Sequence, residues 1–371
     1  MKKLYFDNSA TTPVRKEVVF EMNKAMLTDY GNPSSNHAVG DRASKLLLDS
    51  RTKIARAIGA KVHEIYFTSG TTESNNWVFS GLAHTNPSKK RILISSVEHP
   101  SIRETANLFK NWGYKIVEIP VSSEGFVDLD FIEKNIDSET LFVSVIHANN
   151  IFGTIQPLKK IGDICKSKNV LFHTDCAQSF GKMKMWVHDW NIDLLSASAH
   201  KIGGPKGVGL LYVRDGVKFS PLILGGGQEK GLRSGTENVP GIVGFAKACD
   251  LSLKENWTKV SEVRDYLITG LEKIGGKIIG VSGRDRIANN VFVSFTEVNG
   301  EDLMYKLSNE GVYVSTGSAC DSKKEKEDSS LLAIGLNKEQ IKKSIRISLP
   351  FNVSKKDVDY FLKVLRKFVK R

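Results

Sequence analysis

Short apolar segments alternate with stretches of helical periodicity along most of the chain, and this alternation restricts the possible folds more than any other feature. Over residues 41–58, for example, apolar side chains recur at helical spacing until Gly59 ends the pattern. Further helices are predicted at 101–112 and 157–168, and strands at 64–68, 91–95, 114–119, 141–147, 170–175, 194–198 and 209–213. Strands joined by helical crossovers form a mostly parallel sheet, which binds its ligand beyond the carboxyl ends of the strands. The pattern therefore predicts an α/β fold.

A second α/β unit is predicted after about residue 250. A long charged helix at 252–273 leads into it. The remaining predicted elements are strands at 290–295, 312–315 and 344–348 and helices at 300–310 and 355–369. A chain of 371 residues is too long for one small core and suits a large domain with a smaller one. We predict a large domain over 15–254 and a small domain from 1–14 and 255–371.

Composition argues against several classes of protein. The four cysteines lack CxxC pairing, so they form neither a disulfide framework nor a zinc knuckle. The segment HTDC at 173–176 alternates its side chains along a strand end, so we expect no metal there. The net charge of +12 comes from lysines spread along the chain, and we interpret it as a basic surface rather than a nucleic-acid site. Without a membrane-spanning apolar stretch or a secretory signal, the sequence predicts a cytoplasmic protein.

Lys201 ends the segment SASAHK at 196–201 and precedes the glycine-rich turn IGGPKG at 202–207. A lysine just past a buried strand is well placed to bind an aldehyde as a Schiff base. Burial near other cations lowers the pKa of its amine, which must be neutral to attack. A lysine before glycines also commonly lies on the surface or binds phosphate, so this motif alone leaves all three interpretations open.

Asp175 lies at the end of the predicted strand 170–175. A carboxylate there could pair with the ring nitrogen of pyridoxal 5'-phosphate and so let the ring accept electrons. An acid at a strand end is otherwise a helix cap or a turn former. Because strand-end residues of neighbouring strands meet in one crevice, Asp175, Gln178 and Lys201 together favour the cofactor.

Two further motifs have both a structural and a functional interpretation. Residues 69–74 (SGTTES) offer hydroxyls at a helix start, which predicts either a phosphate site or a plain helix cap. Cys320 ends the segment GSAC at 317–320 and precedes a polar stretch at 321–330. A lone cysteine is commonly a small buried hydrophobe, but an accessible thiolate is a nucleophile. The other cysteines, which lie within helical or strand patterns, are expected in the core: Cys165, Cys176 and Cys249.

Taken together, these motifs resemble the NifS/IscS-type cysteine desulfurases of the class V aminotransferase family. The resemblance runs from Tyr5 to about Tyr360. Its pieces follow in order: FDNSATTP at 6–13, GNPSSNH at 31–37, FTSGTTESNN at 67–76, EH at 98–99, HANN at 147–150, HTDCAQSFGK at 173–182, SASAHKIGGPKG at 196–207, GGGQEKGLRSGT at 225–236, STGSAC at 315–320 and SIRISL at 344–349. It implies fold-type I of the pyridoxal-phosphate enzymes, with a mostly parallel seven-stranded sheet in the large domain and a smaller C-terminal α/β domain.

The resemblance also implies roles around the cofactor ring. Lys201 would bind the cofactor aldehyde, and His99 would stack on the ring and move a substrate proton. Asp175 would pair with the ring nitrogen and Gln178 with the ring hydroxyl. Asn150 would lie near that hydroxyl and the substrate carboxylate.

The remaining implied roles concern the phosphate, the substrate and the partner subunit. The phosphate ligands would be the side chains of Thr72, Ser198 and His200 and the backbone at Thr71. Thr236 would reach the phosphate of the partner subunit, which implies a homodimer with shared active sites. Arg346 would clamp the substrate carboxylate, because a planar fork suits that task.

The implied reaction converts L-cysteine to L-alanine and leaves a persulfide on Cys320, carried by a loop of the small domain. An iron–sulfur scaffold or a tRNA- or cofactor-thiolating enzyme would then accept the sulfur. A selenocysteine lyase or cysteine sulfinate desulfinase is the alternative within the same chemistry. A basic nucleic-acid-binding protein with a degenerate fold is the other alternative, which the intact site residues argue against. Ile151, where the family commonly has glutamate, and the charged run KKEKE at 323–327 depart from the pattern and leave the acceptor open.

Overall fold

Seven strands form the central sheet of the structure, a computed structural model that describes residues 2–317 and 329–369. The strands are β2 (Ile65–Thr68), β3 (Arg91–Ser95), β4 (Lys115–Ile119), β5 (Thr140–Ser144), β6 (Leu171–Asp175), β7 (Leu194–Ser198) and β8 (Gly209–Val213). They lie in the order β2-β8-β7-β6-β5-β3-β4. Strand β8 is antiparallel to β2 and β7, and the other neighbours are parallel. The predicted mostly parallel sheet is confirmed.

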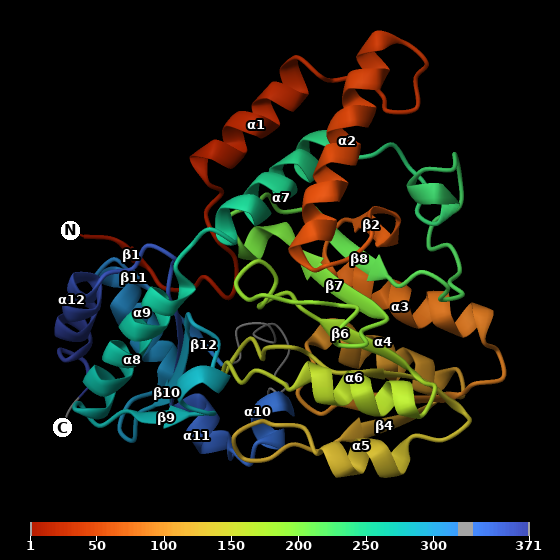
Figure 1. Ribbon diagram of the computed structural model, residues 1–371. Helices are drawn as coiled ribbons and strands as arrows, with labels where there is room; N and C mark the ends of the chain where they lie inside the picture. The colour runs from red at the N-terminus through yellow and green to blue at the C-terminus, as the bar shows by residue number, and fades with distance from the viewer. Residues whose placement is uncertain (1, 318–328, 370–371) are drawn as a thin grey trace.

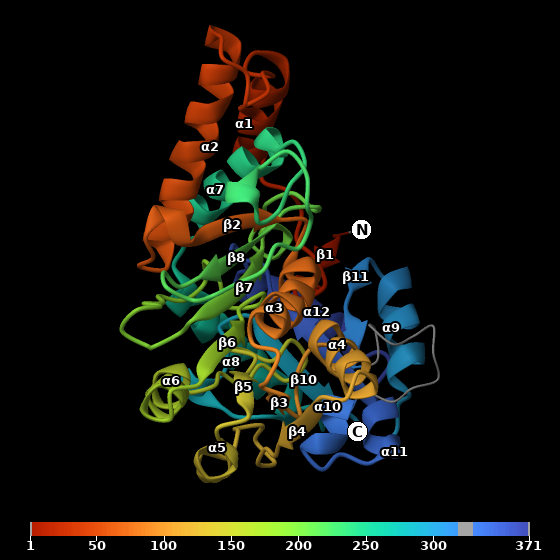
Figure 2. The same cartoon turned by 90° about the vertical axis from the view of Figure 1, so that its right-hand side faces the viewer.

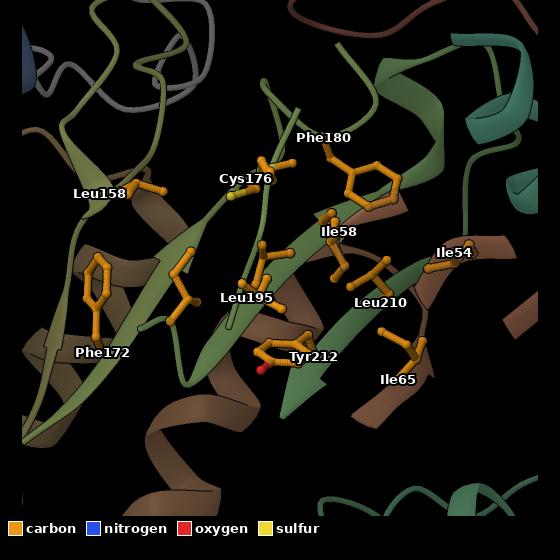
Figure 3. Packing of buried hydrophobic residues seen from close by; sticks show 14 of the residues in the cluster. Ile54, Ile58, Ile65, Leu158, Phe172, Cys176, Phe180, Leu195, Leu210 and Tyr212 are labelled. Atoms are coloured by element: carbon orange, nitrogen blue, oxygen red, sulfur yellow. The ribbon is translucent and has the colours of Figure 1, made fainter. Parts of the chain in front are cut away.

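Helices cover both faces of this sheet (Figure 1). One face packs against α1 (Lys16–Leu27), α2 (Ala38–Ala57), α5 (Leu129–Asn135), α6 (Leu158–Ser167) and α7 (Val239–Ser252), and the other against α3 (Thr71–Thr85) and α4 (Pro100–Asn111). Leu210 and Tyr212 of β8 point into the first cluster, which Figure 3 shows, while Leu211 and Val213 point into the second. Because both faces are buried, the inner strand β8 (GLLYV) reads as a nearly continuous apolar run.

A smaller unit follows α7. Its antiparallel sheet has the order β12-β13-β10-β9, and β1 pairs with β11 beside it (Figure 2). Its strands are β1 (Leu4–Tyr5), β9 (Lys277–Ile279), β10 (Asn290–Ser294), β11 (Val312–Tyr313), β12 (Ser315–Thr316) and β13 (Ser344–Ser348). Its helices are α8 (Trp257–Glu272), α9 (Gly300–Asn309), α10 (Ser329–Ala333), α11 (Lys338–Lys342) and α12 (Lys355–Leu365).

The N-terminal segment packs in the core of this smaller unit. Leu4 and Phe6 belong to the same buried cluster as Val291, and the Phe6 ring lies 5.6 Å from that of Phe361 between centroids. The packing agrees with grouping the first residues with the C-terminal ones, although the division after residues 14 and 254 stays a prediction.

Several predicted elements end earlier in the structure: the strand predicted at 141–147 ends at Ser144, and the helix predicted at 355–369 ends at Leu365. Two others differ further. The helix predicted at 252–273 was wrong at its start, because Ser252 ends α7 and α8 begins only after Asn256, whose side chain accepts a hydrogen bond from the Lys259 N–H. Helix α7 escaped prediction since most of its residues are buried, which removes the polar face that produces periodicity. The strand predicted at 312–315 is instead two strands, β11 and β12, which pair in different sheets. Within the described ranges, no helix has both the length and the apolar character to cross a membrane.

Candidate active site

A cavity of about 620 Å³ lies where β6 and β7 end, and it collects residues from both units of the chain. Ten of the residues predicted for the site line it: Thr71, Thr72, His99, Asn150, Asp175, Gln178, Ser198, His200, Lys201 and Arg346. The register of the sheet explains part of this convergence, because Asp175 of β6 pairs with Ser196 of β7, two residues before the end of that strand. The structure therefore brings together side chains that lie up to 275 positions apart in the sequence, from Thr71 to Arg346.

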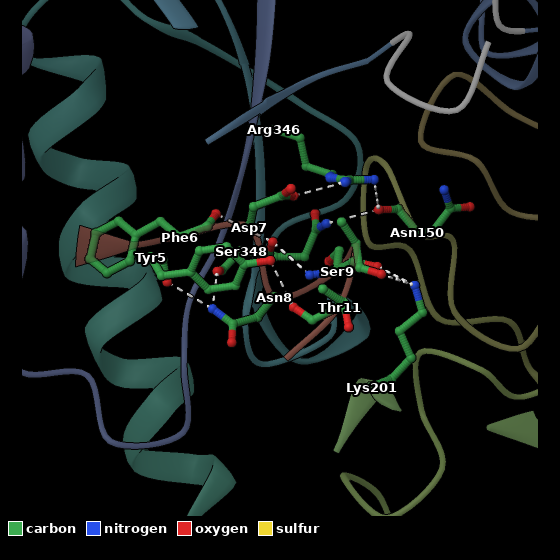
Figure 4. A network of polar contacts seen from close by, with 12 residues as sticks. Tyr5, Phe6, Asp7, Asn8, Ser9, Thr11, Asn150, Lys201, Arg346 and Ser348 are labelled. Carbon is green, nitrogen blue, oxygen red and sulfur yellow. Dashed lines mark hydrogen bonds and ion pairs between the residues drawn. The ribbon is translucent and has the colours of Figure 1, made fainter. Parts of the chain in front are cut away.

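Lys201 lies in a short helical turn, Ala199–Lys201, that directly follows β7. Its Nζ donates hydrogen bonds to the carbonyl oxygens of Ser9 at 2.6 Å and Ala10 at 2.8 Å (Figure 4). The Ser9 carbonyl also accepts a hydrogen bond from Gln178 Nε2 at 3.0 Å. Two backbone carbonyls thus hold the amine at the cavity wall. The segment that supplies them is fixed in turn, since the Thr12 N–H donates to the His200 carbonyl.

Asp175 is the last residue of β6 and is only 1% exposed. Its Oδ1 accepts a hydrogen bond from the Ala177 N–H and its Oδ2 from Asn75 Nδ2, both at 2.8 Å. The side chain is therefore a buried acceptor that points toward a ligand site.

His99 caps the N-terminus of α4, and its position follows from that role. Its Nδ1 accepts a hydrogen bond from the Ser101 N–H at 3.2 Å and lies 2.8 Å from Ser101 Oγ. Pro100, at the first helical position, has no N–H that needs a partner. The local sequence thus fixes the imidazole at the cavity rim.

The opposite part of the cavity provides donors for an anion. Helix α3 begins at Thr71 without any side-chain cap, so its first N–H groups remain available beside Thr72. Among the described residues Thr71 Oγ1 is buried and has no hydrogen-bond partner. Burial, with the nearby cations Lys201 and Lys206, lowers the pKa of His200 to about 4. His200 is therefore a neutral imidazole at physiological pH.

These groups fit pyridoxal phosphate. A helix start with an unpartnered hydroxyl suits a phosphate, and a buried carboxylate suits a protonated ring nitrogen. A lysine amine between them suits an aldehyde. The fit to pyridoxal phosphate rests on these three groups together and not on any single residue.

Arg346 comes from β13 of the smaller unit and is 3% exposed. Its Nη2 contacts Asp7 Oδ1 at 3.0 Å, and its Nη1 donates to the Asn150 carbonyl oxygen at 3.2 Å (Figure 4). Its Nε is buried without a hydrogen-bond partner in the described part of the chain. A carboxylate and a carbonyl thus orient the guanidinium plane at the edge of the cavity.

One predicted site residue lines a different cavity, and another is not among the residues that the structure describes. Thr236 lines a neighbouring cavity of about 80 Å³, which shares Ser69 and Gly207 with the larger one. Cys320 lies outside the described residues.

The other cysteines are core residues, as predicted, and all three are buried. Burial raises the pKa of the Cys176 and Cys249 thiols to about 12, and it raises the pKa of Cys165 as well. A thiol with such a pKa is not a nucleophile near neutral pH.

Sequence reasoning missed several residues of the site. Asp7 and Ser9 lie in the quoted segment FDNSATTP, and Asn75 lies in FTSGTTESNN, but neither segment indicated a role for them. Asn75 follows Thr71 by one helical turn, a spacing that places both on the same side of α3. Glu98 is fully buried; burial raises its pKa to about 8, and it accepts a hydrogen bond from the Ile146 N–H. It fixes the turn that presents His99.

The comparisons with known proteins agree with this geometry. The model of the family "Aminotransferase class-V" matches residues 4–361. The chain is 43% identical to "Cysteine desulfurase IscS" of Clostridium botulinum, covering 100% of this chain and 95% of the relative. It is 44% identical to the protein of the same name from Methanosarcina thermophila, covering 100% and 93%. A solved structure titled "NIFS-LIKE PROTEIN" superposes with a TM-score of 0.92 at 40% identity and covers 99% of both chains.

The family model matches nearly the whole chain, and the relative from Clostridium botulinum is 43% identical over the full length of this chain. The cavity also contains side chains that fit pyridoxal phosphate. The chain belongs to the class V aminotransferase family and, within it, to the cysteine desulfurases, which are pyridoxal-phosphate enzymes.

Proposed function

We propose that this protein converts L-cysteine to L-alanine and that the sulfur is left as a persulfide on Cys320. The observation that carries the proposal is the shared cavity, which is lined by Lys201, Asp175 and Arg346. An amine binds an aldehyde, a buried carboxylate balances a protonated ring nitrogen, and a guanidinium binds the carboxylate of an amino acid. Relatives named cysteine desulfurase, 43% and 44% identical over the whole chain, support cysteine as the substrate.

Pyridoxal phosphate bound here would supply an electron sink for the electron pair left when the substrate loses its α-proton. Lys201 would hold the aldehyde, Asp175 the ring nitrogen and Gln178 the ring hydroxyl. The phosphate would be held by the backbone at Thr71 and by the side chains of Thr72, Ser198 and His200. A ring N–H of His200 can donate a hydrogen bond to the phosphate.

Lys201 would also act as the base that takes the α-proton of the substrate at its Nζ. The carbonyl oxygens of Ser9 and Ala10 can accept hydrogen bonds from its ammonium form, so they would hold the proton at Nζ after transfer. His99 would stack on the ring and move a further proton. Arg346 and Asn150 would fix the substrate carboxylate and thereby orient the α-hydrogen.

Sulfur transfer requires a nucleophile, and Cys320 would supply it. Its thiolate attacks the substrate sulfur, a sulfur–sulfur bond forms, and the carbon–sulfur bond breaks. The carbon keeps the electron pair of the broken bond and takes a proton, so it is reduced while the thiolate sulfur is oxidised. Alanine leaves, and the persulfide stays on the chain.

Replacing Cys320 with serine tests the proposal directly. We expect alanine production from cysteine to fall about a hundredfold, because a hydroxyl is a far weaker nucleophile than a thiolate. The measurement is the rate of alanine formation by amino-acid analysis, together with mass spectrometry of the chain for the added sulfur. Cys249→Ala is the matched control, since it removes a buried thiol with a raised pKa.

Alanine formation at the wild-type rate in the Cys320→Ser variant would remove Cys320 from the mechanism. The same variant separates the alternative activity, because selenium can leave without a cysteine nucleophile. For a desulfurase, we expect the Cys320→Ser variant to lose turnover of cysteine but to keep its turnover of selenocysteine or cysteine sulfinate. Faster turnover of those two substrates than of cysteine in the wild-type protein would favour a selenocysteine lyase or desulfinase.

We further propose a homodimer in which Thr236 of each subunit completes the phosphate site of the other. Thr236 lines a small cavity next to the larger one rather than the larger cavity itself, which supports a role for Thr236 in the site of the other subunit. Mixed dimers of a Lys201→Ala subunit and a Thr236→Ala subunit should recover about half of the wild-type activity, because one site then holds both intact residues. If the two residues act in the same subunit, the mixed dimer will show no more activity than the average of its parents.

The sulfur acceptor is proposed from the relatives' names alone. IscS-type relatives favour an iron–sulfur scaffold, and a tRNA-thiolating enzyme is the other candidate. Three buried cysteines without disulfide bonds fit a reducing compartment, and we propose the cytoplasm.

A further inference from the structure

We propose that Asn75 is a positioning residue that connects His99 to Asp175 through the hydroxyl of Ser101. In this role it orients the Asp175 carboxylate and keeps the proton of the neutral His99 ring on Nε2. The inference deepens the proposed function and rests on it for the roles of His99 and Asp175.

The contacts form one continuous chain. Asn75 Nδ2 lies 2.8 Å from Asp175 Oδ2 and 2.8 Å from Ser101 Oγ. Ser101 Oγ lies 2.8 Å from His99 Nδ1. Each link has the length of a good hydrogen bond.

The chemistry of the groups fixes the direction of each bond. The amide nitrogen of Asn75, and not its oxygen, faces Asp175, and it donates to Asp175 Oδ2. Both protons of that nitrogen are then used, one toward Asp175 and one toward Ser101 Oγ. Ser101 Oγ accepts one of these protons and keeps its own proton available for His99 Nδ1.

A second donor leads to the same conclusion. The backbone N–H of Ser101 also points to His99 Nδ1, at 3.2 Å, and an N–H can only donate. His99 Nδ1 is therefore an acceptor, and the proton of the neutral ring sits on Nε2. Two donors from one residue thus select one tautomer.

Burial makes this chain rigid. Asn75 is fully buried and Ser101 is 9% exposed, so bulk water has little access to replace a lost link. The Asn75 Oδ1 atom has no hydrogen-bond partner within the described ranges. Both N–H groups of the Asn75 amide are used, whereas its oxygen is unpaired in this part of the chain. The reversed orientation would place this oxygen against the Asp175 carboxylate, so the side chain is oriented to donate.

The test measures the His99 tautomer without any turnover. Nitrogen NMR of ¹⁵N-histidine in the full-length chain, with and without pyridoxal phosphate, reports the protonation of Nδ1 and Nε2. We expect wild-type His99 to carry its proton on Nε2. In Asn75→Ala and Ser101→Ala the tautomer ratio should fall roughly two- to tenfold, as expected for the loss of one neutral hydrogen bond.

The two variants should differ in cofactor binding. Asn75→Ala removes the donor that orients Asp175, so the dissociation constant of pyridoxal phosphate should rise roughly tenfold. Ser101→Ala leaves that donor in place and should change the constant less than twofold. Thr105→Val is the matched control, because the Thr105 hydroxyl is buried in the same helix α4 but bonds only the Ser101 carbonyl.

Asn75→Leu keeps most of the volume of the side chain without adding a charge and guards against collapse of the alanine variant. If Asn75 only fills space, this variant will bind the cofactor as tightly as the wild type; if Asn75 is a donor to Asp175, it should weaken binding about as much as Asn75→Ala. Wild-type tautomer ratios in Asn75→Ala and Ser101→Ala would overturn the inference. Because the tautomer is read without cysteine, that outcome is distinct from a failure to form alanine.

Discussion

A Lys201→Ala variant is expected to lose alanine formation by roughly four orders of magnitude, because one side chain supplies both a covalent anchor and a proton acceptor. The Lys201 amine lines the cavity and is held by the Ser9 and Ala10 carbonyls. Without it, those two carbonyls face the cavity with no ammonium to donate to them. The variant should also release pyridoxal phosphate on dialysis, since no covalent link would remain.

The measurement is borohydride treatment followed by peptide mass spectrometry. In the wild type, the cofactor should be fixed to the peptide that contains Lys201. In the variant no peptide should carry it, while Lys218→Ala, which removes an exposed lysine outside the cavity, should behave as wild type. Fixation to another peptide of the variant, such as the one with Lys206, would mean that a different lysine binds the aldehyde.

The cavity-lining residues at strand ends were predictable because they depend on local rules. Asp175 and Lys201 follow buried apolar runs, and the carboxyl ends of adjacent parallel strands meet in one crevice. The start of α3 was predictable for a similar reason, since hydroxyls before a helical pattern mark the beginning of a helix, where they predict either a phosphate site or a plain cap.

The supporting contacts could not be predicted, because they join distant segments through backbone groups. Ser9 holds Lys201 across 192 residues, and Asp7 pairs with Arg346 across 339. A carbonyl oxygen has no signature in the sequence, and an aspartate near the N-terminus looks like any surface acid. The contact of Ser9 with Lys201 and that of Asp7 with Arg346 become visible only once the N-terminal segment is seen to pack between the two units.

Ser348 illustrates how tertiary packing sets that arrangement. Its Oγ accepts a hydrogen bond from the Ser9 N–H at 2.8 Å, and its carbonyl oxygen accepts from the Asn8 side chain (Figure 4). Strand β13 therefore carries Arg346 toward the cavity and also fixes the segment that holds Lys201. One strand thus connects Arg346 with the segment that holds Lys201. The hydrophobic periodicity of the sequence cannot show this connection.

Replacing Asp175 with asparagine should reduce alanine formation by roughly a thousandfold, because the side chain keeps its shape but loses the charge that balances a protonated ring nitrogen. The Ala177 N–H and Asn75 Nδ2 both donate to Asp175. An amide offers only one oxygen, so its NH₂ group would face one of these donors. The substitution thus removes the charge and also leaves a buried donor without an acceptor.

Two measurements separate the charge from the misplaced hydrogen bond. Exchange of the α-hydrogen of alanine in D₂O isolates proton removal from sulfur transfer, and it should fall with alanine formation. A cofactor analogue methylated on its ring nitrogen carries a fixed positive charge and should restore part of the exchange in Asp175→Asn. Asp193→Asn is the matched control, because Asp193 also accepts a backbone N–H, from Phe172, but lies outside the cavity. Exchange at the wild-type rate in Asp175→Asn would show that the ring nitrogen needs no carboxylate, and Asp175 would then be a structural residue of β6.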